Sequence, residues 1–465
     1  MSIDCDFVFR REHPRRRANR EIWERIRAAY NGGDSYIQRA LIKHVSEVEP
    51  EYLERQRRAC YFNYPRKLSN LITNYVLSVE PQRDGASPEL VEDFSRDGLR
   101  VNEVMRRYST MLNLYGNAAL LVEMPYFEGE IDEERKISER LRPGVRVLSP
   151  LEIADWATGS DGKLQWLILE ECRMLDNGPF LPPTPVRRRK LWTREEYYIF
   201  ESSRDGSVQL LAQGKNPLDA VPVVMMNLSE HAAVKNSTFE DVVRISDAIL
   251  NNQSESQMNI VKQMFGLLVI SDTFARGVRS EQPAGKGASA ERFSHIIARS
   301  AAIWETPEER GISRYISPSG ADSATIREEN MLLKQELYEI LGLTLIPGSN
   351  QPESAESKSW DQHQTRQFLT GRVDLLEQSE IACWELMHRF DETIPIPSVI
   401  YNREFAVVDL QHTMEALLGI HQLADGPEFR KEIGRTALFL LEKIKKVPSS
   451  IRSKILKELE GAAHV

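Results

Sequence analysis

Three long helical patterns, separated by glycine- and proline-rich breaks, fill the stretch from Asn236 to Phe390 of this 465-residue chain. The first pattern covers Phe239–Phe265, and a helix of that length would be about 40 Å long at 1.5 Å per residue. Each helix carries an apolar stripe that needs a packing partner. That partner is either the rest of the chain or a neighbouring copy of it, and we favour neighbouring copies.

The apolar stripe of the first helix is interrupted. A polar run, Asn251–Gln257, separates two groups of apolar positions, which are Val242, Ile245 and Ile249 before it and Ile260 and Met264 after it. We expect these five side chains to contact an adjacent subunit. The alternative is that the polar run is a loop between two shorter helices.

The second and third helices flank a break that contains a proline. The second begins at Asp322 or Ser323 and ends at Gly342, and Pro347 prevents it from resuming. The third begins near Ser354 or Ser357, and its apolar residues alternate spacings of four and three, as in a coiled-coil seam. The seam positions are Leu369, Val373, Leu376, Cys383, Met387 and Phe390, with Glu380 in the remaining slot.

The rest of the chain mixes helical and extended patterns, which predicts an α+β fold. The region Val145–Met226 is rich in strand patterns, with hairpin turn signals at Asp161-Gly162 and Asp205-Gly206. Helical patterns precede it and are predicted at Glu21–Tyr30, Ser35–Glu47, Pro50–Ala59, Pro65–Leu77 and Val101–Leu114.

Two basic clusters stand out in a chain whose formal net charge is −9. Such a charge argues against a protein that grips nucleic acid over a broad surface. We interpret the second cluster, Arg187–Lys190, as ordinary surface, and the first as a solvated N-terminal arm or as a contact to phosphate or an acidic neighbour. The first cluster consists of Arg10, Arg11, Arg15, Arg16, Arg17 and Arg20.

Four widely spaced cysteines, with no C-x-x-C pair, predict free thiols in a reducing compartment. The N-terminus lacks a signal-peptide pattern, and the apolar run Phe265–Ile270 is too short to span a bilayer. We therefore expect a protein made inside the cell, without membrane association.

No catalytic signature is present, whether phosphate-binding loop, zinc-protease helix or nucleophile elbow. The sequence therefore predicts a protein that is not an enzyme and binds no cofactor or metal. The alternative is a metal-dependent enzyme that uses the carboxylates clustered between Glu128 and Glu134.

The order of several local stretches resembles the portal proteins of tailed bacteriophages. The matching stretches, in chain order, are Tyr115–Pro125, Val221–Asn227, Thr238–Asp241, Ser246–Ile249, Ile316–Gly320, Ile326–Leu341 and Glu353–Glu356. They extend over residues 115–390, which is most of the chain.

The resemblance implies a portal fold with an α/β wing, a helical stem, a small clip, a tunnel loop and a C-terminal helical crown. By position these would be a basic N-terminal arm at 1–19, the wing at 20–235 and 354–408, stem helices at 236–265 and 322–341, the clip at 266–321, the tunnel loop at 342–353, and the crown at 409–465.

The resemblance also implies a function. Portal proteins form a ring, usually of twelve copies, at one capsid vertex of the virion, and assemble in the host cytoplasm. Double-stranded DNA passes through the ring without sequence recognition; the implied partners are the terminase large subunit, the major capsid and scaffolding proteins and a head-completion adaptor. The residues implied to face the DNA are Leu345, Ile346, Pro347, Gly348, Ser349 and Asn350. A helical scaffold or adaptor that forms no ring is the other reading.

Overall fold

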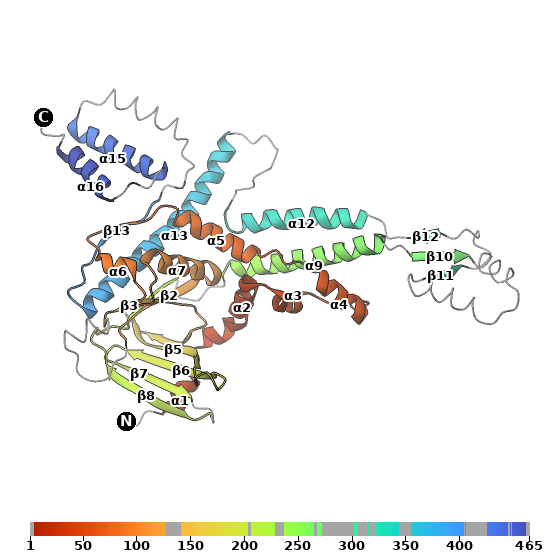
Figure 1. Cartoon of the computed structure of the whole chain (residues 1–465), viewed down its shortest axis with the longest axis horizontal. Helices are drawn as coiled ribbons and strands as arrows, with labels where there is room; N and C mark the ends of the chain where they lie inside the picture. Colours follow the sequence, from red (N-terminus) through yellow and green to blue (C-terminus); the bar gives the residue numbers. More distant parts are fainter. Residues whose placement is uncertain are drawn as a thin grey trace.

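Helices and strands both contribute to the body of the protein, as the α+β expectation requires. The computed structural model describes residues 4–125, 141–202, 206–227, 237–264, 267–271, 302–305, 314–316, 321–343, 355–403, 405, 426–444, 447 and 449–461. Figure 1 shows a helical body with a sheet below it in the view, and a pair of long helices that extends away from the body.

Seven helices and two strands lie in the N-terminal quarter of the described chain. In order they are α1 (Cys5–Arg10), α2 (Pro14–Asn31), α3 (Asp34–Ala40), α4 (Glu49–Arg58), α5 (Tyr64–Val76), β1 (Gln82–Asp84), α6 (Pro88–Glu92), α7 (Val101–Tyr115) and β2 (Asn117–Glu123). Prolines in the first turns of α2, α4, α5 and α6 favour helix initiation at these points.

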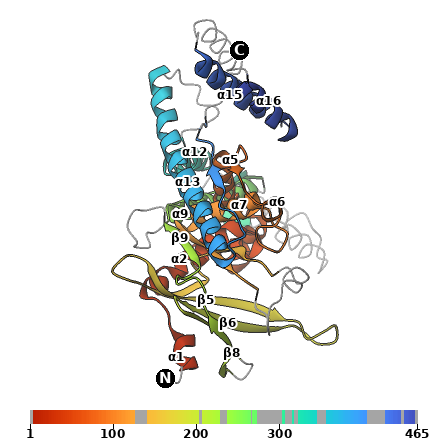
Figure 2. The same ribbon diagram turned by 90° about the vertical axis from the view of Figure 1, so that its left-hand side faces the viewer.

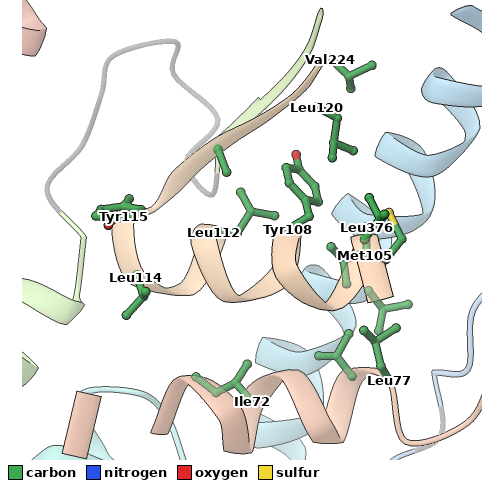
Figure 3. Close-up of a cluster of buried hydrophobic side chains, with 14 of the residues drawn as sticks. Ile72, Leu77, Met105, Tyr108, Leu112, Leu114, Tyr115, Leu120, Val224 and Leu376 are labelled. Atoms are coloured by element: carbon green, nitrogen blue, oxygen red, sulfur yellow. The ribbon is translucent and has the colours of Figure 1, made fainter. Parts of the chain in front are cut away.

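The main core is built around α7 and β2. Gly116 joins them with a positive φ of 71°, a conformation that glycine adopts at little cost. Tyr108 and Leu112 of α7 point toward Leu120 of β2 in Figure 3, and Ile72 of α5 packs on the other side of the helix. All four side chains are buried, so this cluster orients the helical body against the strands.

The sheet region folds as the turn signals indicate. Its strands are β3 (Gly144–Leu148), β4 (Ile153–Thr158), β5 (Leu164–Leu175), β6 (Thr184–Thr193), β7 (Glu196–Ser202), β8 (Val208–Lys215) and β9 (Val223–Asn227). One antiparallel sheet has the order β3-β2-β9, and a second, visible edge-on in Figure 2, is the meander β4-β5-β6-β7-β8.

A single continuous helix, α9 (Phe239–Met264), follows the sheets. The alternative that Asn251–Gln257 forms a loop is therefore wrong. The reason is that these polar side chains find hydrogen-bond partners on neighbouring helices, as described below. The helix α12 (Ala321–Glu339) lies beside α9 in Figure 1 and packs along it.

Three short strands follow the far end of α9. They are β10 (Leu267–Ser271), β11 (Ala302–Glu305) and β12 (Arg314–Ile316). The strand β10 is central, parallel to β11 and antiparallel to β12.

The third long helix, α13 (Ala355–Phe390), crosses the body and packs against α5, α7, β2, β9 and β13 (Ser398–Ile400). Five of its six apolar seam residues are buried in the main core of this chain, and Phe390 packs against that core. Glu380, the charged seam position, is fully buried and pairs with Arg83 Nε at 2.5 Å. The hydroxyl of Tyr401 donates a second hydrogen bond to Glu380 at 2.5 Å. Two C-terminal helices, α15 (Pro427–Ile444) and α16 (Ser449–Gly461), pack on each other.

One predicted helix is shorter than expected. The pattern Ser35–Glu47 gives a helix only to Ala40. The backbone N–H of Ile42 donates instead to Asn251 Oδ1 at 2.8 Å, and its carbonyl accepts from Arg55 at 2.6 Å. Side-chain hydrogen bonds thus replace the helical ones from this point.

The basic N-terminal cluster is only partly a solvated arm. The helix α2 begins at Pro14, and two of the six arginines pair with carboxylates of the sheet, Arg11 with Asp155 and Arg16 with Glu170, while the other four are exposed. Arg16 is 4% exposed and contacts Glu12 at 3.0 Å and Glu170 at 2.9 Å. Arg189 is also buried and contacts the same Glu170 oxygen at 3.2 Å, so the second basic cluster is not plain surface either. Burial opposes ionisation of Glu170, but its arginine partners outweigh burial and lower its pKa.

Candidate inter-subunit surface

The first half of α9 is embedded in the core of the body. Phe239, Val242 and Ile249 are buried and belong to the main apolar cluster, and Ile245 packs against it. The neighbouring helices α2, α5 and α7 supply the contacts. These predicted interface residues therefore have their packing partners within the chain, and the surface that α9 can offer to another copy lies further along the helix.

A charged and hydrogen-bonded group locks this half of α9 to the N-terminal helices. The Tyr36 hydroxyl donates to Asp247 Oδ1 at 2.5 Å, and Arg25 Nη2 contacts Asp247 Oδ2 at 2.6 Å. Burial, reinforced by the hydrogen bond to Asp247, raises the pKa of Tyr36 above its ordinary value. The phenol therefore stays protonated and keeps its role as donor at physiological pH.

The second half of α9 packs through polar side chains. Asn252 Nδ2 donates to Asn330 of α12 at 3.1 Å, and Asn259 Nδ2 donates to Ser323 at 3.2 Å. The buried residues here are Ser254 and Ser256 rather than large apolar ones. Hydrogen bonds between neutral groups contribute only about 1 kcal/mol each. The second half of α9 is therefore held weakly compared with the first half, which we call the base.

The segment between α3 and α4 lies along the same part of α9. Arg55 of α4 donates to Ser254 Oγ at 3.0 Å, and both its Nε and Nη2 contact the Glu47 carboxylate at 2.8 Å. The Arg55 guanidinium lowers the pKa of Glu47 despite an opposing effect of burial. Asn251 Nδ2 also donates to the carbonyl of Ala40 at 3.2 Å. This network fixes the α3–α4 segment on α9.

Large apolar side chains are exposed on the two elements that flank the second half of α9, which are α12 and the α3–α4 segment. On α12, Met331 is 62% and Leu332 is 60% exposed; we name this pair the α12 patch. The α3–α4 patch consists of the exposed side chains Ile42, Val45, Val48 and Leu53.

The two patches lie on elements at opposite sides of α9. In Figure 1, α12 lies above α9 and α4 lies below it. The predicted interface residues Ile260 and Met264, on α9 itself, are 46% and 75% exposed. Exposed apolar residues gathered on one element are a feature of association surfaces.

The predicted tunnel-loop residues, Leu345 to Asn350, lie outside the described residues. The described chain stops before them at Leu343, which is buried, just after Gly342 with its φ of +62°. The hydroxyl of Thr365 on α13 donates to the Gly342 carbonyl at 2.9 Å. The end of the second long helix is therefore fixed against the third.

The acidic residues Glu128 to Glu134, considered above as metal ligands, also lie outside the described residues. Elsewhere, the described part of the chain has no group of three or more residues that could hold a metal ion. Within that same part, no helix is both long and apolar enough to cross a membrane.

The most informative residues that sequence reasoning missed are those of the α3–α4 patch, together with Asn251 and Arg55, which hold this segment on α9. The pattern predicted a helix through Glu47, which would have placed Val45 in a helical stripe. A usable signal was present, because Glu47 and Arg55 are complementary charges on either side of Pro50.

No family model matches this chain, and no curated protein matches it either. Similar solved structures include a chain from the neck of an empty GTA particle, at 14% identity and a TM-score of 0.45, covering 80% of this chain and 90% of that one. Another is from the virion of a native gene transfer agent particle, at 14% identity and a TM-score of 0.44, covering 80% and 89%. A third, from the neck of a native GTA particle, has 13% identity, a TM-score of 0.43 and coverage of 80% and 89%.

Proposed function

We propose that this chain is the subunit of a closed ring of identical copies, of the portal type, at a capsid vertex through which double-stranded DNA passes. The observation that carries the proposal is the pair of exposed apolar patches on opposite sides of α9. A surface of this kind costs free energy in water, at about 25 cal/mol for each Å² that stays uncovered.

Two different patches on one chain favour head-to-tail assembly. If the α12 patch of one copy contacts the α3–α4 patch of the next, a row of copies keeps one free patch at each of its two ends. Repetition of such a contact gives a ring when the rotation closes. Ile260 and Met264 would contribute to the same interface, since they lie on the helix between the patches.

The charge of the long helices suits a channel that does not grip DNA. The sequence of α12 contains five carboxylates and two cationic residues, and that of α9 contains four and two. Each cation–phosphate contact adds salt-dependent affinity for DNA. Helices with an excess of carboxylates would instead repel the phosphates and let the duplex move.

The finer assignments follow from the same proposal. The pair α9–α12 would be the stem, the small sheet of β10, β11 and β12 the clip, and Leu345 to Asn350 the loop that contacts DNA. Terminase, capsid and scaffolding proteins and a head-completion adaptor would bind outside the channel. Replacing Leu345 and Ile346 by Asp should leave the ring intact and impair DNA packaging; normal packaging would refute the loop assignment.

Two double variants test the head-to-tail contact. One carries Met331→Glu and Leu332→Glu in the α12 patch, and the other carries Val45→Glu and Val48→Glu in the α3–α4 patch. Each variant alone should be a folded monomer, because one partner surface of every contact is lost. A mixture should form a one-to-one dimer and nothing larger, since only one intact contact can form.

Native mass spectrometry separates the outcomes. The matched control carries Phe180→Glu and Leu181→Glu, which place the same two charges on side chains that are 95% and 63% exposed in the β5–β6 connection. This control should assemble like the natural chain. Rings formed by either patch variant would contradict the proposed interface, and unfolding measured by circular dichroism would reveal a variant that failed for another reason.

A further inference from the structure

The hairpin formed by β5 and β6 extends beyond the rest of the five-stranded sheet. In the described sheet, β4 pairs with β5 only up to Leu169, and β7 pairs with β6 only from Arg188. The strands β5 and β6 continue to pair with each other beyond these points, starting with Cys172 opposite Arg187. Residues 172–187, which we call the hairpin end, therefore have no further strand beside them in the described sheet.

The hairpin end carries four exposed apolar side chains. Phe180 and Leu181, in the connection between the strands, are 95% and 63% exposed, and Met174 and Leu175 of β5 are also more than half exposed. Large apolar side chains gathered on one protruding element are a feature of surfaces that another molecule covers.

Hydrogen bonds hold the connection in one conformation. Asn177 Nδ2 donates to the Pro182 carbonyl and to Thr184 Oγ1, both at 2.7 Å. The backbone N–H of Gly178 donates to Asp176 Oδ1 at 2.9 Å. Because the connection is already ordered, a partner can bury its apolar side chains at a small cost in conformational entropy.

A pocket of about 700 Å³ lies between one face of the same sheet and the C-terminal end of α13. Its apolar lining includes Tyr197 and Ile199 of β7, Leu211 of β8 and Phe390 of α13. The ring of Trp192 lies beside that of Tyr197, with centroids 5.1 Å apart. Leu211 is exposed, so this apolar wall can be reached from outside.

The cations that β6 contributes to the pocket are already paired. Lys190 contacts Glu123 at 2.9 Å and Glu171 at 3.4 Å, and Arg188 pairs with Glu201. These pairs leave no charge on the two cations for a ligand to neutralise. An apolar group that needs no counter-charge therefore suits the pocket better than an ionic one.

We propose that the hairpin end of one copy inserts Phe180 and Leu181 into this pocket of the adjacent copy. The inference rests on the proposed ring, in which every copy has such a neighbour. A second copy is the occupant that fits, because the chain presents both a protruding apolar element and a hollow with an apolar wall. A lipid surface fits less well, since Asp176 lies in the same connection and a carboxylate is costly to bury in hydrocarbon.

The contact is too small to hold two copies together by itself. Stable interfaces bury about 1,200–2,000 Å² in total, far more than one hairpin end covers. It should therefore form only between copies that the α12 patch and the α3–α4 patch already hold together. Rings of the chain with Phe180→Glu and Leu181→Glu should form with the natural mass but dissociate at a lower urea concentration than natural rings.

A peptide that copies residues 172–187 tests the pocket directly. Arg187→Cys in the peptide places a thiol opposite Cys172, so that a disulfide closes the hairpin. The peptide is labelled with fluorescein and titrated with the full-length α12-patch variant, which is expected to be a monomer, and fluorescence anisotropy is measured. Saturable binding is expected. The same peptide with Phe180→Glu and Leu181→Glu should bind about tenfold more weakly, because its apolar contacts are lost.

A matched pair of variants locates the binding site on the chain. Leu211→Glu places a charge on the apolar wall of the pocket and should weaken peptide binding about tenfold. Leu210→Glu changes the preceding residue of β8, which is also exposed but does not line the pocket, and should leave binding unchanged. Both positions are on the surface, and circular dichroism should show that both variants fold.

Three results would overturn the inference. They are no saturable binding of the hairpin peptide, equal peptide affinity of the Leu211→Glu and Leu210→Glu chains, and rings of the Phe180→Glu, Leu181→Glu chain that resist urea as well as natural rings. A natural chain that forms no ring would instead contradict the proposed function. The peptide titration needs no ring, so it would still decide whether the pocket accepts the hairpin end.

Discussion

The two halves of α9 are packed by different kinds of side chain. The half that begins at Phe239 buries large apolar side chains in the body, whereas the half that ends at Met264 buries serines and pairs asparagines with α12. Apolar burial is worth about 1.5–3 kcal/mol for each large side chain, while a neutral hydrogen bond adds about 1 kcal/mol. The base is therefore stable by itself, and the far half depends on further contacts.

Because of this difference, the first half of α9 should affect folding and the second half should affect assembly. Substitutions in the base should unfold the chain whatever its oligomeric state. Substitutions at exposed positions of the far half should leave the fold intact and act on association.

The largest effect on folding is expected for Phe239→Ala, which empties a fully buried site in the base. The free energy of unfolding should fall by about 3–5 kcal/mol, as for other buried aromatic truncations. Ile260→Ala, at an exposed site of the same helix, should change it by less than about 0.5 kcal/mol in the monomer. Each substitution is introduced into the chain with Met331→Glu and Leu332→Glu, which is expected to be a monomer, and urea unfolding gives the free energy of unfolding. Equal losses in the two variants would contradict the difference between the two halves of α9.

A comparable loss is expected from Arg83→Met in the body. The change leaves the fully buried carboxylate of Glu380 without its cation, which costs about 3 kcal/mol or more. Adding Glu380→Leu should restore part of that loss, because no unpaired charge then remains. A double-mutant cycle by chemical denaturation measures the coupling, and strictly additive losses would show that the pair does not interact energetically.

A smaller, pH-dependent effect is expected for the α3–α4 segment. Glu47 has a lowered pKa in the folded chain, so its pair with Arg55 stabilises the fold above the unfolded pKa and is lost as pH falls through the folded value. Glu47→Gln should cost about 1–2 kcal/mol at pH 7. The difference from the natural chain should be constant above the ordinary Glu pKa of about 4.3 and should shrink steadily as the pH falls below it. A difference that does not shrink at all in acid would contradict the assignment.

The smallest effect should come from the polar contacts between α9 and α12. Asn252→Ala removes the hydrogen bond to Asn330 and should cost about 1 kcal/mol. Hydrogen exchange of α12 amides should become faster in this variant, while exchange in α7 stays the same. Unchanged exchange in α12 would show that other contacts hold the pair.

Periodicity and turn chemistry predicted most of the elements. The three long helices, the helix at Val101–Leu114 and two hairpin turns of the meander were all visible in the sequence. Periodicity does not identify the element against which a helix packs. The seam of α13 has coiled-coil spacing, yet it packs on helices and strands of its own chain, and Glu380 fits there because Arg83 lies opposite.

The candidate site was predicted only in part for the same reason. Ile260 and Met264 are exposed, and their contact with a second copy stays a prediction, whereas Val242 and Ile249 are buried in the body. The α3–α4 patch escaped prediction because its shape depends on Asn251 and Arg55. These two residues are far from each other in sequence, and no local pattern brings them together.

The mass of the purified natural chain tests the central claim most directly. Native mass spectrometry at micromolar concentration should show one species at a high integral multiple of 53.3 kDa, and negative-stain images should show rings with a central hole. Particles that remain at 53.3 kDa across protein and salt concentrations, with no ring in the images, would contradict the account.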